Sequence, residues 1–417
     1  MLAAACASAF APRSAGKPSG IRREIFLASP GKGTAVVASA YYTKSHGGQM
    51  LSVEQRWSRS DTVDVAFYRF SSDYGKTWSA PVERRTGERR PTGMLRRHLA
   101  GGWVDPSNGR FIELWNEAIL PSDDPLEGLK QWNIFYALSE DGGRSHHDVR
   151  QIIHKGEEFD ARHPLPGVYT GKNAVTLGDT ASMPLRLGDG SILIPVEITP
   201  IKPDGSLYNP GGGYTYCDSA VLIGRWKGGA IEWEMGHRII GDPERTTRGM
   251  LEPTVASLKD GRVMIVMRGS NDKKTSLPAH KWVSYSSDGG RHWTKPAPWT
   301  YTTGEAFFSP SACSQLVPHS SGRLFWLGNI SPENAKGNRP RYPFVVGEVD
   351  LDSGRLIRDR VRVVDDKSEA DDPILMLSNF FAREDRQTKE IALHMSRVFA
   401  FPDGWVGDAF LYRITVD

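Results

Sequence analysis

A strand-forming segment recurs along the whole chain, and this repeat restricts the fold more than any other feature. Each copy begins at a turn that ends in glycine, or in threonine in the last copy, and continues with a short run of residues that favour β-strands. The copies follow one another at roughly seventy residues, which is the spacing of a structural unit rather than of a single turn. They begin at Gly33, Gly109, Gly190, Gly261, Gly322 and Thr388. Six copies fill the chain, so we expect an all-β protein built from six similar sheets.

A second motif, Ser-x-Asp-x-Gly-x-x-Trp, follows some of these strands. Intact copies surround Asp73 and Asp288, while the copy around Asp141 has His146 in place of its tryptophan. Aspartate accepts backbone N–H bonds in a tight hairpin, and glycine supplies the positive φ that such a turn requires. The tryptophan is a large apolar side chain that can fill the space beneath the turn. The motif therefore predicts structural hairpins in phase with the repeat, with a degenerate hairpin at residues 218–229.

Composition excludes several classes of protein. The 43 glycines and 27 prolines are dispersed, as expected for short strands joined by tight turns. The 52 basic and 49 acidic residues are interleaved and leave a net charge of +3, which argues against a nucleic-acid partner. No apolar run reaches the length of a membrane span. The cysteines at positions 6, 217 and 313 form neither a metal-ligand pattern nor a disulfide framework.

The first twenty residues differ from the rest of the chain. They begin with small apolar residues and continue with proline, serine and glycine, as in a short or clipped secretion signal followed by a tether. A disordered, alanine-rich start is the alternative. We expect a secreted or periplasmic protein in which residues 21–417 form one domain, because no linker divides them.

The Asp-containing hairpins, in phase with six strand repeats, resemble the Asp-box (BNR) repeats of the sialidase superfamily. The resemblance implies a six-bladed β-propeller, with four antiparallel strands in each blade and closed edges. Seven blades remain an alternative, because the glycine-rich stretch 203–216 leaves room for irregular strands.

In a propeller, the innermost strands surround an axial well, so repeat-equivalent residues should converge there. Counting back roughly nine residues from each repeat start leads to one set of candidates: Arg23, His98, Ala181 or Ser182, Glu252, Ser311 and Asn379. The far ends of the repeat strands give a second set: Tyr41, Asn116 or Glu117, Glu197, Arg268, Asn329 and Arg397.

The resemblance also implies roles for some of these residues. The segment from Glu252 to Arg268 is similar to the glutamate-to-arginine segment of sialidases, and the loop containing Asp61 resembles their acid/base loop. Several arginines would bind the substrate, because guanidinium groups bind a planar carboxylate in bidentate fashion. The implied substrate-binding residues are Arg22 or Arg23, Arg56, Arg97, Arg268, Arg339, Arg341 and Asn379.

The sequence departs from the sialidase pattern at the catalytic tyrosine. Cys313 is the best-aligned residue at that position, which leaves a mechanism through a tyrosyl intermediate without its nucleophile. Tyr342 is the candidate replacement if its loop folds inward. The catalytic candidates are thus Asp61, His98, Glu252 and Tyr342.

A histidine beside an arginine suggests a different chemistry. His98 can abstract a proton, and Arg97 can neutralise a uronate carboxylate, as in propeller-fold polysaccharide lyases that act on rhamnose-uronate linkages. Tyr169 or Tyr216 would then be the acid.

Three functions follow from these candidates: a sialidase-like exo-glycosidase, which we favour, a polysaccharide lyase, and a non-catalytic glycan-binding propeller. All three bind an acidic oligosaccharide or polysaccharide. We expect a monomer that requires no cofactor, and no loop spacing in the sequence supports a structural Ca²⁺.

Overall fold

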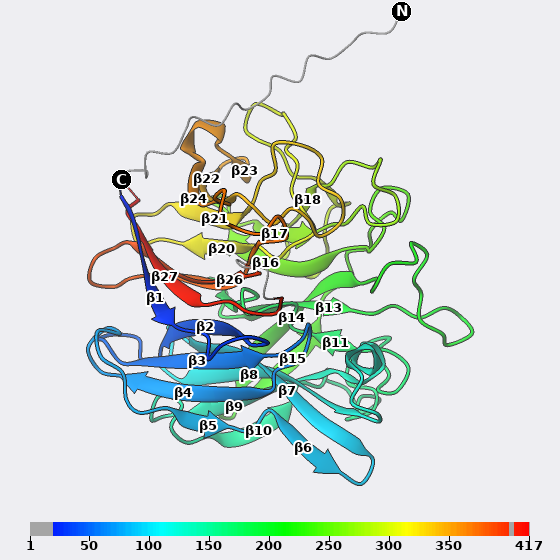
Figure 1. The fold of residues 1–417 in the computed structure, drawn as a ribbon. Coiled ribbons are helices and arrows are strands. Elements are labelled where there is room, and N and C mark those ends of the chain that lie inside the picture. Colours follow the sequence, from blue (N-terminus) through cyan, green and yellow to red (C-terminus); the bar gives the residue numbers. More distant parts are fainter. Residues whose placement is uncertain (1–19, 400–403, 417) are drawn as a thin grey trace, which may run out of the picture.

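The computed structural model describes residues 20–399 and 404–416, which form a six-bladed β-propeller of antiparallel sheets (Figure 1). The predicted all-β fold and its six blades are confirmed, and the described residues contain no seventh sheet. Three sheets have the expected four strands, and the other three have a fifth short strand. Apart from Gly20, the predicted signal and tether lie outside the described residues.

The strands follow the chain from blade to blade, with one exception at the start. Blade 1 contains β2 (Ala35–Tyr42), β3 (Met50–Trp57), β4 (Val65–Ser71) and β5 (Val82–Arg84). Blade 2 contains β6 (Gly87–Arg90), β7 (Gly93–Val104), β8 (Phe111–Leu120), β9 (Asn133–Ser139) and β10 (His147–Gln151). Blade 3 contains β11 (Val175–Thr176), β12 (Leu185–Arg186), β13 (Ile192–Ile198), β14 (Asp218–Lys227) and β15 (Ala230–Met235).

The second half of the ring repeats this plan. Blade 4 contains β16 (Leu251–Ser257), β17 (Val263–Arg268), β18 (Lys281–Ser286) and β19 (Ala297–Pro298). Blade 5 contains β20 (Gln315–Pro318), β21 (Leu324–Asn329), β22 (Phe344–Asp350), β23 (Arg355–Leu356) and β24 (Arg362–Asp365). Blade 6 contains β25 (Met376–Glu384), β26 (Ile391–Val398), β27 (Ala409–Ile414) and β1 (Ile21–Leu27). Short helices are η1 (Pro125–Glu127), α1 (Gly128–Gln131) and η2 (Arg358–Arg360).

The ring closes where the first strand joins the last blade. β1 lies antiparallel beside β27, as the dark blue and red strands of Figure 1 show. Asp365 reinforces this closure, since its carboxylate accepts hydrogen bonds from Arg23 at 3.0 Å, from Arg397 at 2.5 Å and from the Tyr412 hydroxyl. Pairing the outermost strand in this way leaves no open break in the ring.

The hydrophobic core lies between neighbouring blades rather than at the centre. One apolar cluster joins blades 2 and 3, and others join blades 3 and 4, 4 and 5, and 5 and 6. Stacking the sheets buries both faces of most inner strands; β17, for example, is buried along its whole length. The axis is therefore left to the polar ends of the innermost strands.

The Asp motifs form the predicted hairpins. In blade 1, the Asp73 carboxylate accepts hydrogen bonds from the Thr77 backbone N–H at 3.0 Å and from the Thr77 and Ser71 hydroxyls. These bonds lower the pKa of Asp73 to about 2. Asp141 and Asp288 are bonded in the same way, in the hairpins between the last two strands of blade 2 (β9 and β10) and of blade 4 (β18 and β19). The expected degenerate hairpin is the tight turn between β14 and β15.

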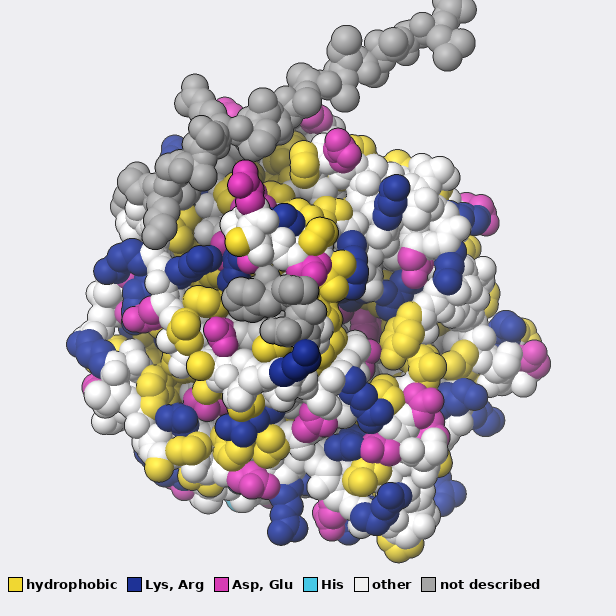
Figure 2. Space-filling model, viewed as in Figure 1, with side chains coloured by type: hydrophobic (Ala, Val, Ile, Leu, Met, Phe, Trp, Pro, Cys, Tyr) yellow, Lys and Arg dark blue, Asp and Glu magenta, His cyan; other side chains and the backbone are white. Residues whose placement is uncertain are grey.

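Charged side chains are spread over the surface. On the face seen in Figure 2, acidic and basic side chains alternate and no large region carries a single sign. Within the described ranges, no helix is long and apolar enough to cross a membrane.

Candidate functional site

A pocket of about 500 Å³ lies where the innermost strands of the six blades meet. Its lining includes residues from every blade, as expected for the axial well of a propeller. Six of the predicted catalytic and substrate-binding residues are in this lining: Asp61, His98, Glu252, Arg268, Arg341 and Asn379.

The other catalytic and substrate-binding candidates do not line the pocket, whereas Asn116 and Glu197, from the second set of repeat-equivalent candidates, do. The neighbours of Arg56 on β3 are Gln55 and Trp57, and both line the pocket. Because successive side chains of a strand point to opposite faces, the Arg56 guanidinium faces away from the pocket. It lies 4.9 Å from the centre of the Phe67 ring. Arg97 forms an ion pair with Glu117 at 2.6 Å.

Tyr342 and Arg339 are also outside the pocket lining. The Tyr342 ring packs against the apolar cluster between blades 5 and 6, and its hydroxyl donates to the Pro373 carbonyl at 3.3 Å. The Arg339 backbone N–H donates to the Lys336 carbonyl at 3.3 Å. Tyr342 therefore does not take the place of the absent tyrosine.

The phase of the first repeat explains the position of Arg23. Gly33 precedes β2, the first strand of blade 1, whereas each other repeat start precedes a later strand of its blade, namely β8, β13, β17, β21 or β26. Counting back from Gly33 therefore leads into β1, at the outer edge of blade 6. There Arg23 pairs with Asp365, and Arg22 pairs with Glu390 at 2.8 Å. Neither arginine lines the pocket.

Three pocket residues have a backbone that L-amino acids rarely adopt. The φ angles of Asp61, Glu252 and Asn379 are +56°, +43° and +55°. Glu252 and Asn379 each lie at a shift in strand register, between β16 and β17 and between β25 and β26. Such bulges redirect side chains, and strained residues concentrate at functional sites. The local geometry thus supports a functional role for these positions.

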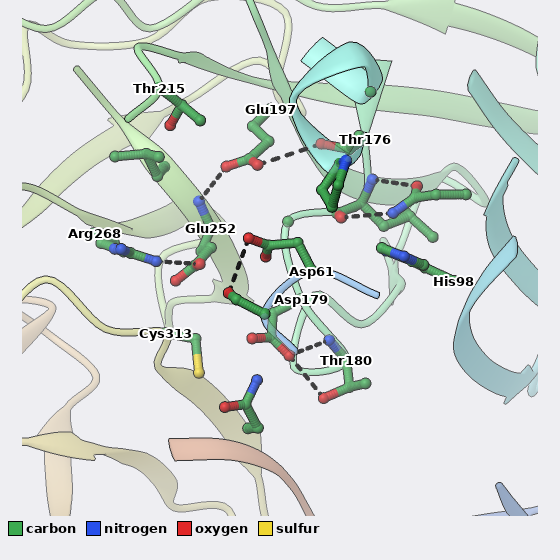
Figure 3. A pocket seen from close by; sticks show the side chains of 18 of the residues that line it. Asp61, His98, Thr176, Asp179, Thr180, Glu197, Thr215, Glu252, Arg268 and Cys313 are labelled. Carbon is green, nitrogen blue, oxygen red and sulfur yellow. Dashed lines mark hydrogen bonds and ion pairs between the residues drawn. The ribbon is translucent and has the colours of Figure 1, made fainter. Parts of the chain in front are cut away.

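Two carboxyl groups and a thiol lie together in the pocket (Figure 3). One ligand atom from each of Asp179, Glu252 and Cys313 lies within 4.8 Å of the other two. Glu252 forms an ion pair with Arg268, while its second oxygen is buried and has no hydrogen-bond partner. Burial, together with the nearby Glu252 charge, raises the pKa of Asp179 to about 6. Asp179 therefore holds a proton in mildly acidic solution.

Glu197 lies on the other side of Glu252. Its carboxylate accepts the Glu252 backbone N–H at 2.9 Å and the Thr176 hydroxyl at 3.3 Å. Burial is the largest cause of its raised pKa, about 7, and the Glu252 charge adds to it. Four carboxyl groups, those of Asp61, Asp179, Glu197 and Glu252, therefore line one pocket.

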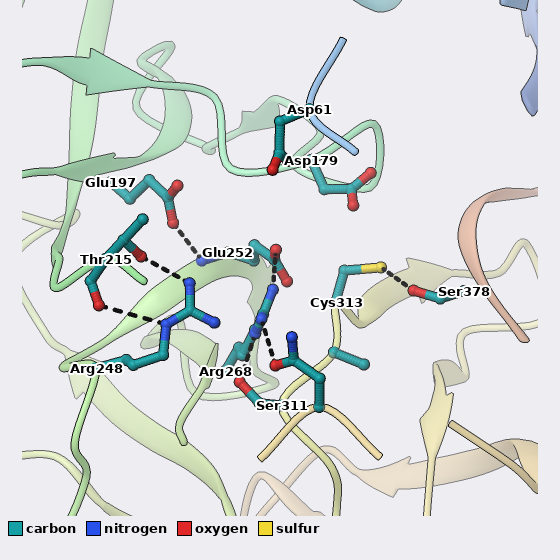
Figure 4. Close-up of polar contacts among 12 residues, drawn as sticks. Asp61, Asp179, Glu197, Thr215, Arg248, Glu252, Arg268, Ser311, Cys313 and Ser378 are labelled. Atoms are coloured by element: carbon teal, nitrogen blue, oxygen red, sulfur yellow. Dashed lines mark hydrogen bonds and ion pairs between the residues drawn. The ribbon is translucent and has the colours of Figure 1, made fainter. Parts of the chain in front are cut away.

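Three arginines, Arg248, Arg268 and Arg341, line the same pocket. Figure 4 shows Arg248 and Arg268 beside Glu252. Each of the three nitrogens of the Arg268 guanidinium has a protein partner, since it also donates to the Ser311 hydroxyl at 2.7 Å and to the Asn338 side-chain oxygen at 3.1 Å. Arg248 binds only Thr215, and Arg341 binds Ser378 and the Ser311 carbonyl. Among the described residues, neither Arg248 nor Arg341 forms an ion pair.

The two arginines without an ion pair, Arg248 and Arg341, have lowered pKa values. Burial, followed by repulsion from Arg268, lowers the pKa of Arg341 to about 10, and the same two causes lower that of Arg248. The Arg341 Nε is buried without a hydrogen-bond partner. The Glu252 charge offsets the lowering of both pKa values only in part, and neither arginine has a carboxylate within ion-pair distance among the described residues, so both keep N–H groups that can bind an anion.

The absent tyrosine leaves two groups to compare. Cys313 lies in the pocket, but burial raises the pKa of its thiol, so a thiolate nucleophile is disfavoured. The one tyrosine in the pocket lining is Tyr214, and its hydroxyl donates to Asp61 at 3.2 Å. Tyr169 and Tyr216, the acids expected for a lyase, are not in the lining.

Sequence reasoning missed two charged residues of the site, Asp179 and Arg248. Both lie in loops that precede an inner strand or hairpin, where the repeat imposes no fixed spacing. The predicted candidates Ala181 and Ser182 lie only two and three residues after Asp179. Arg248 lies four residues before Glu252, and this proximity to a predicted residue was the only available signal.

Comparison with solved structures identifies other proteins of this fold. A Dyadobacter fermentans protein of unknown function matches with a TM-score of 0.60 and 14% identity, over 95% of this chain and 100% of its own. The Hadza microbial sialidase Hz136 matches with a TM-score of 0.59 and 15% identity, over 91% of this chain and 66% of its own. An α-L-arabinanase from Penicillium chrysogenum matches with a TM-score of 0.54 and 14% identity, over 94% and 98%.

Sequence comparison supplies the family. No curated protein matches the chain significantly. The model of the BNR repeat-like domain matches residues 122–379, which is more than half of the chain and extends from blade 2 into blade 6. Together with the six blades and the Asp-containing hairpins, this match shows that the chain belongs to the BNR repeat-like domain family.

Proposed function

We propose that this protein is an exo-acting glycoside hydrolase that removes a terminal sugar carrying a carboxylate. The observation that carries the proposal is the pair of close carboxyl groups, Asp179 and Glu252, beside buried arginines in an axial pocket. The sialidase and arabinanase structures of the same fold support a hydrolase, although their low identity relates them to this chain by fold alone.

The arginines define the acidic end of the substrate. Arg248 and Arg341 both have N–H groups left over after their contacts with neutral partners. A sugar carboxylate bound to these N–H groups would add negative charge and offset the repulsion of both arginines by Arg268. Arg268 itself holds Glu252 in place.

Asp179 and Glu252 have different roles in the proposed reaction. Asp179, with its raised pKa, donates a proton to the glycosidic oxygen as the bond between that oxygen and the anomeric carbon breaks. Glu252, paired with Arg268, attacks the anomeric carbon. Water then cleaves this glycosyl ester, while Asp179 takes the proton of the attacking water. The separation of at most 4.8 Å between one oxygen of each residue agrees with this retaining mechanism better than with an inverting one, in which water must fit between the two groups.

One observation favours the lyase as the second candidate. His98 lines the pocket, and burial lowers its pKa to about 4, so the neutral ring is available as a base at neutral pH. Its expected partner is absent, because Arg97 is paired with Glu117 outside the lining. The hydrolase therefore remains the better-supported function.

The test compares three substrates: an aryl sialoside, an aryl glucuronide and a rhamnosyl-glucuronate glycan. Free sugar reports hydrolysis, and ultraviolet absorbance of an unsaturated uronate reports elimination. Hydrolysis by the wild type should fall by about 10²- to 10⁴-fold in Asp179→Asn on substrates with a poor leaving group, and much less on aryl substrates with a good one. Asp189→Asn, a surface variant outside the pocket, is the matched control.

Three outcomes would contradict the proposal. An unsaturated product that is lost in His98→Ala identifies the lyase. Tight binding of all three substrates without turnover identifies a binding protein. A leaving-group dependence that appears in Asp61→Asn, and not in Asp179→Asn, assigns the proton donor to Asp61 instead.

A further inference from the structure

The side of the pocket near blades 1 and 2 is aromatic. Trp57 at the end of β3, His98 on β7, Trp132 after α1 and Trp405 all line it. The His98 ring lies 4.5 Å from that of Trp132 and stacks at 6.5 Å on that of Trp57, measured between ring centres. We call Trp57, His98, Trp132 and Trp405 the aromatic wall.

The aromatic wall is held rigidly. The Trp405 indole N–H donates to the Trp57 carbonyl at 2.7 Å, and the Trp57 indole N–H donates to the Gln55 side-chain oxygen at 3.2 Å. Trp132 depends on Gly128, because a Cβ at that position would lie 2.0 Å from the indole nitrogen. Fixed aromatic rings lose little conformational entropy when a ligand binds.

Polar groups beside the aromatic wall are already used by the protein. The Gln55 amide donates to the Leu99 carbonyl, and the Asn116 side chain both donates to and accepts from the Leu177 backbone. This part of the pocket is therefore lined mainly by aromatic rings, with Asp61 beside His98, while Glu252 and the arginines line another part. Such a surface suits a neutral ligand with one apolar face.

We propose that the aromatic wall is a binding subsite for a second, uncharged sugar ring, namely the pyranose attached to the acidic sugar. The C–H groups on one face of a pyranose form an apolar surface that stacks on an indole, while its hydroxyls remain toward solvent and the rim. The assignment of this ring as the leaving group rests on the proposed hydrolase, but the stacking site does not. The substrate is then at least a disaccharide with one acidic and one neutral ring.

The site can be tested without turnover. Lactose and cellobiose are the neutral probes, and their binding to the full chain is followed by saturation-transfer NMR and tryptophan fluorescence. We expect millimolar binding that weakens about tenfold or more in Trp57→Ala and is largely kept in Trp57→Phe, because phenylalanine retains a ring for stacking. Trp293→Phe, which changes a hairpin tryptophan outside the pocket, should bind as the wild type does.

A second measurement links the subsite to the reaction. With 3′-sialyllactose as substrate, Trp57→Ala should raise KM about tenfold, while KM for methyl sialoside, which lacks the second sugar, should stay within about twofold. Equal effects on both substrates would overturn the role in substrate binding, as would lactose binding that is unchanged in Trp57→Ala or absent from the wild type. If no acidic glycan is cleaved but lactose binding depends on Trp57, the proposed hydrolase fails and the stacking site stands.

Discussion

The ion pair between Arg268 and Glu252 offers the strictest test of the site, because both side chains are buried. The Arg268 side chain is 8% exposed and that of Glu252 is 14% exposed. Arg268→Met leaves the Glu252 carboxylate without its cation, and removal of one partner of a buried pair typically costs about 3–5 kcal/mol. We therefore expect the free energy of unfolding to fall by about 4 kcal/mol.

The double variant Arg268→Met/Glu252→Gln separates the charge effect from other losses. It no longer buries an unpaired carboxylate, so what remains is the loss of the arginine's bonds to Ser311 and Asn338, about 1–2 kcal/mol in total. The double variant should thus be more stable than Arg268→Met alone, and the coupling energy from the full cycle should be about 2 kcal/mol or more.

Equilibrium urea unfolding of the wild type, both single variants and the double variant gives the four free energies. A loss below about 1 kcal/mol in Arg268→Met would refute the reasoning, since that is the range of solvent-exposed ion pairs. A double variant no more stable than Arg268→Met would do the same, because it would show that the buried carboxylate is not the source of the cost.

Three further predictions concern pH, the loop between β13 and β14 that carries Tyr214 of the pocket lining, and ring closure. Since the pKa of Asp179 is raised to about 6 and its protonated form is the donor, kcat/KM should fall as pH rises through about 6, and the pH profile of Asp179→Asn should lack this limb. Gly211→Ala should lower the free energy of unfolding by about 2 kcal/mol and raise KM, because its Cβ would lie 1.9 Å from the Thr247 carbonyl oxygen. Gly188→Ala is the control, because nothing beyond its own chain neighbours lies within 4 Å of its added Cβ. In the same urea and kinetic assays it should change neither quantity. Asp365→Ala should cost about 3 kcal/mol in urea unfolding, whereas Asp352→Ala, which removes only the exposed pair with Lys259, should cost less than about 0.5 kcal/mol. Similar losses would contradict the role given to Asp365 in closing the ring.

The sequence predicted those parts of the fold that its repeat controls. Glu252 and Arg268 were found together because they lie on paired strands of one blade, so a single strand-turn-strand segment carries both. The same counting failed for Arg23, because the first repeat precedes an innermost strand and its upstream neighbour belongs to another blade.

The rest of the site depends on contacts between distant segments. Asp179 reaches the Glu252 carboxylate only through packing of blade 3 against blade 4, and nothing local to position 179 indicates this. The ring stacking of Trp57, His98 and Trp132 likewise joins blades 1 and 2. A pattern within one strand predicts which face is buried, but the identity of the neighbour across a blade boundary is a tertiary property.

The pairing of β1 with β27 also affects the order in which the blades can fold. Residues 21–27 leave the ribosome long before residues 409–414, so the strand that completes blade 6 has no partner while the intervening blades are being made. Blades 1 to 5 each consist of consecutive strands and can pair as they emerge, but the ring cannot close until the last strand is released. Closure of so long a loop is a slow, non-local step, so ring closure is expected to be the last step in the folding of the propeller.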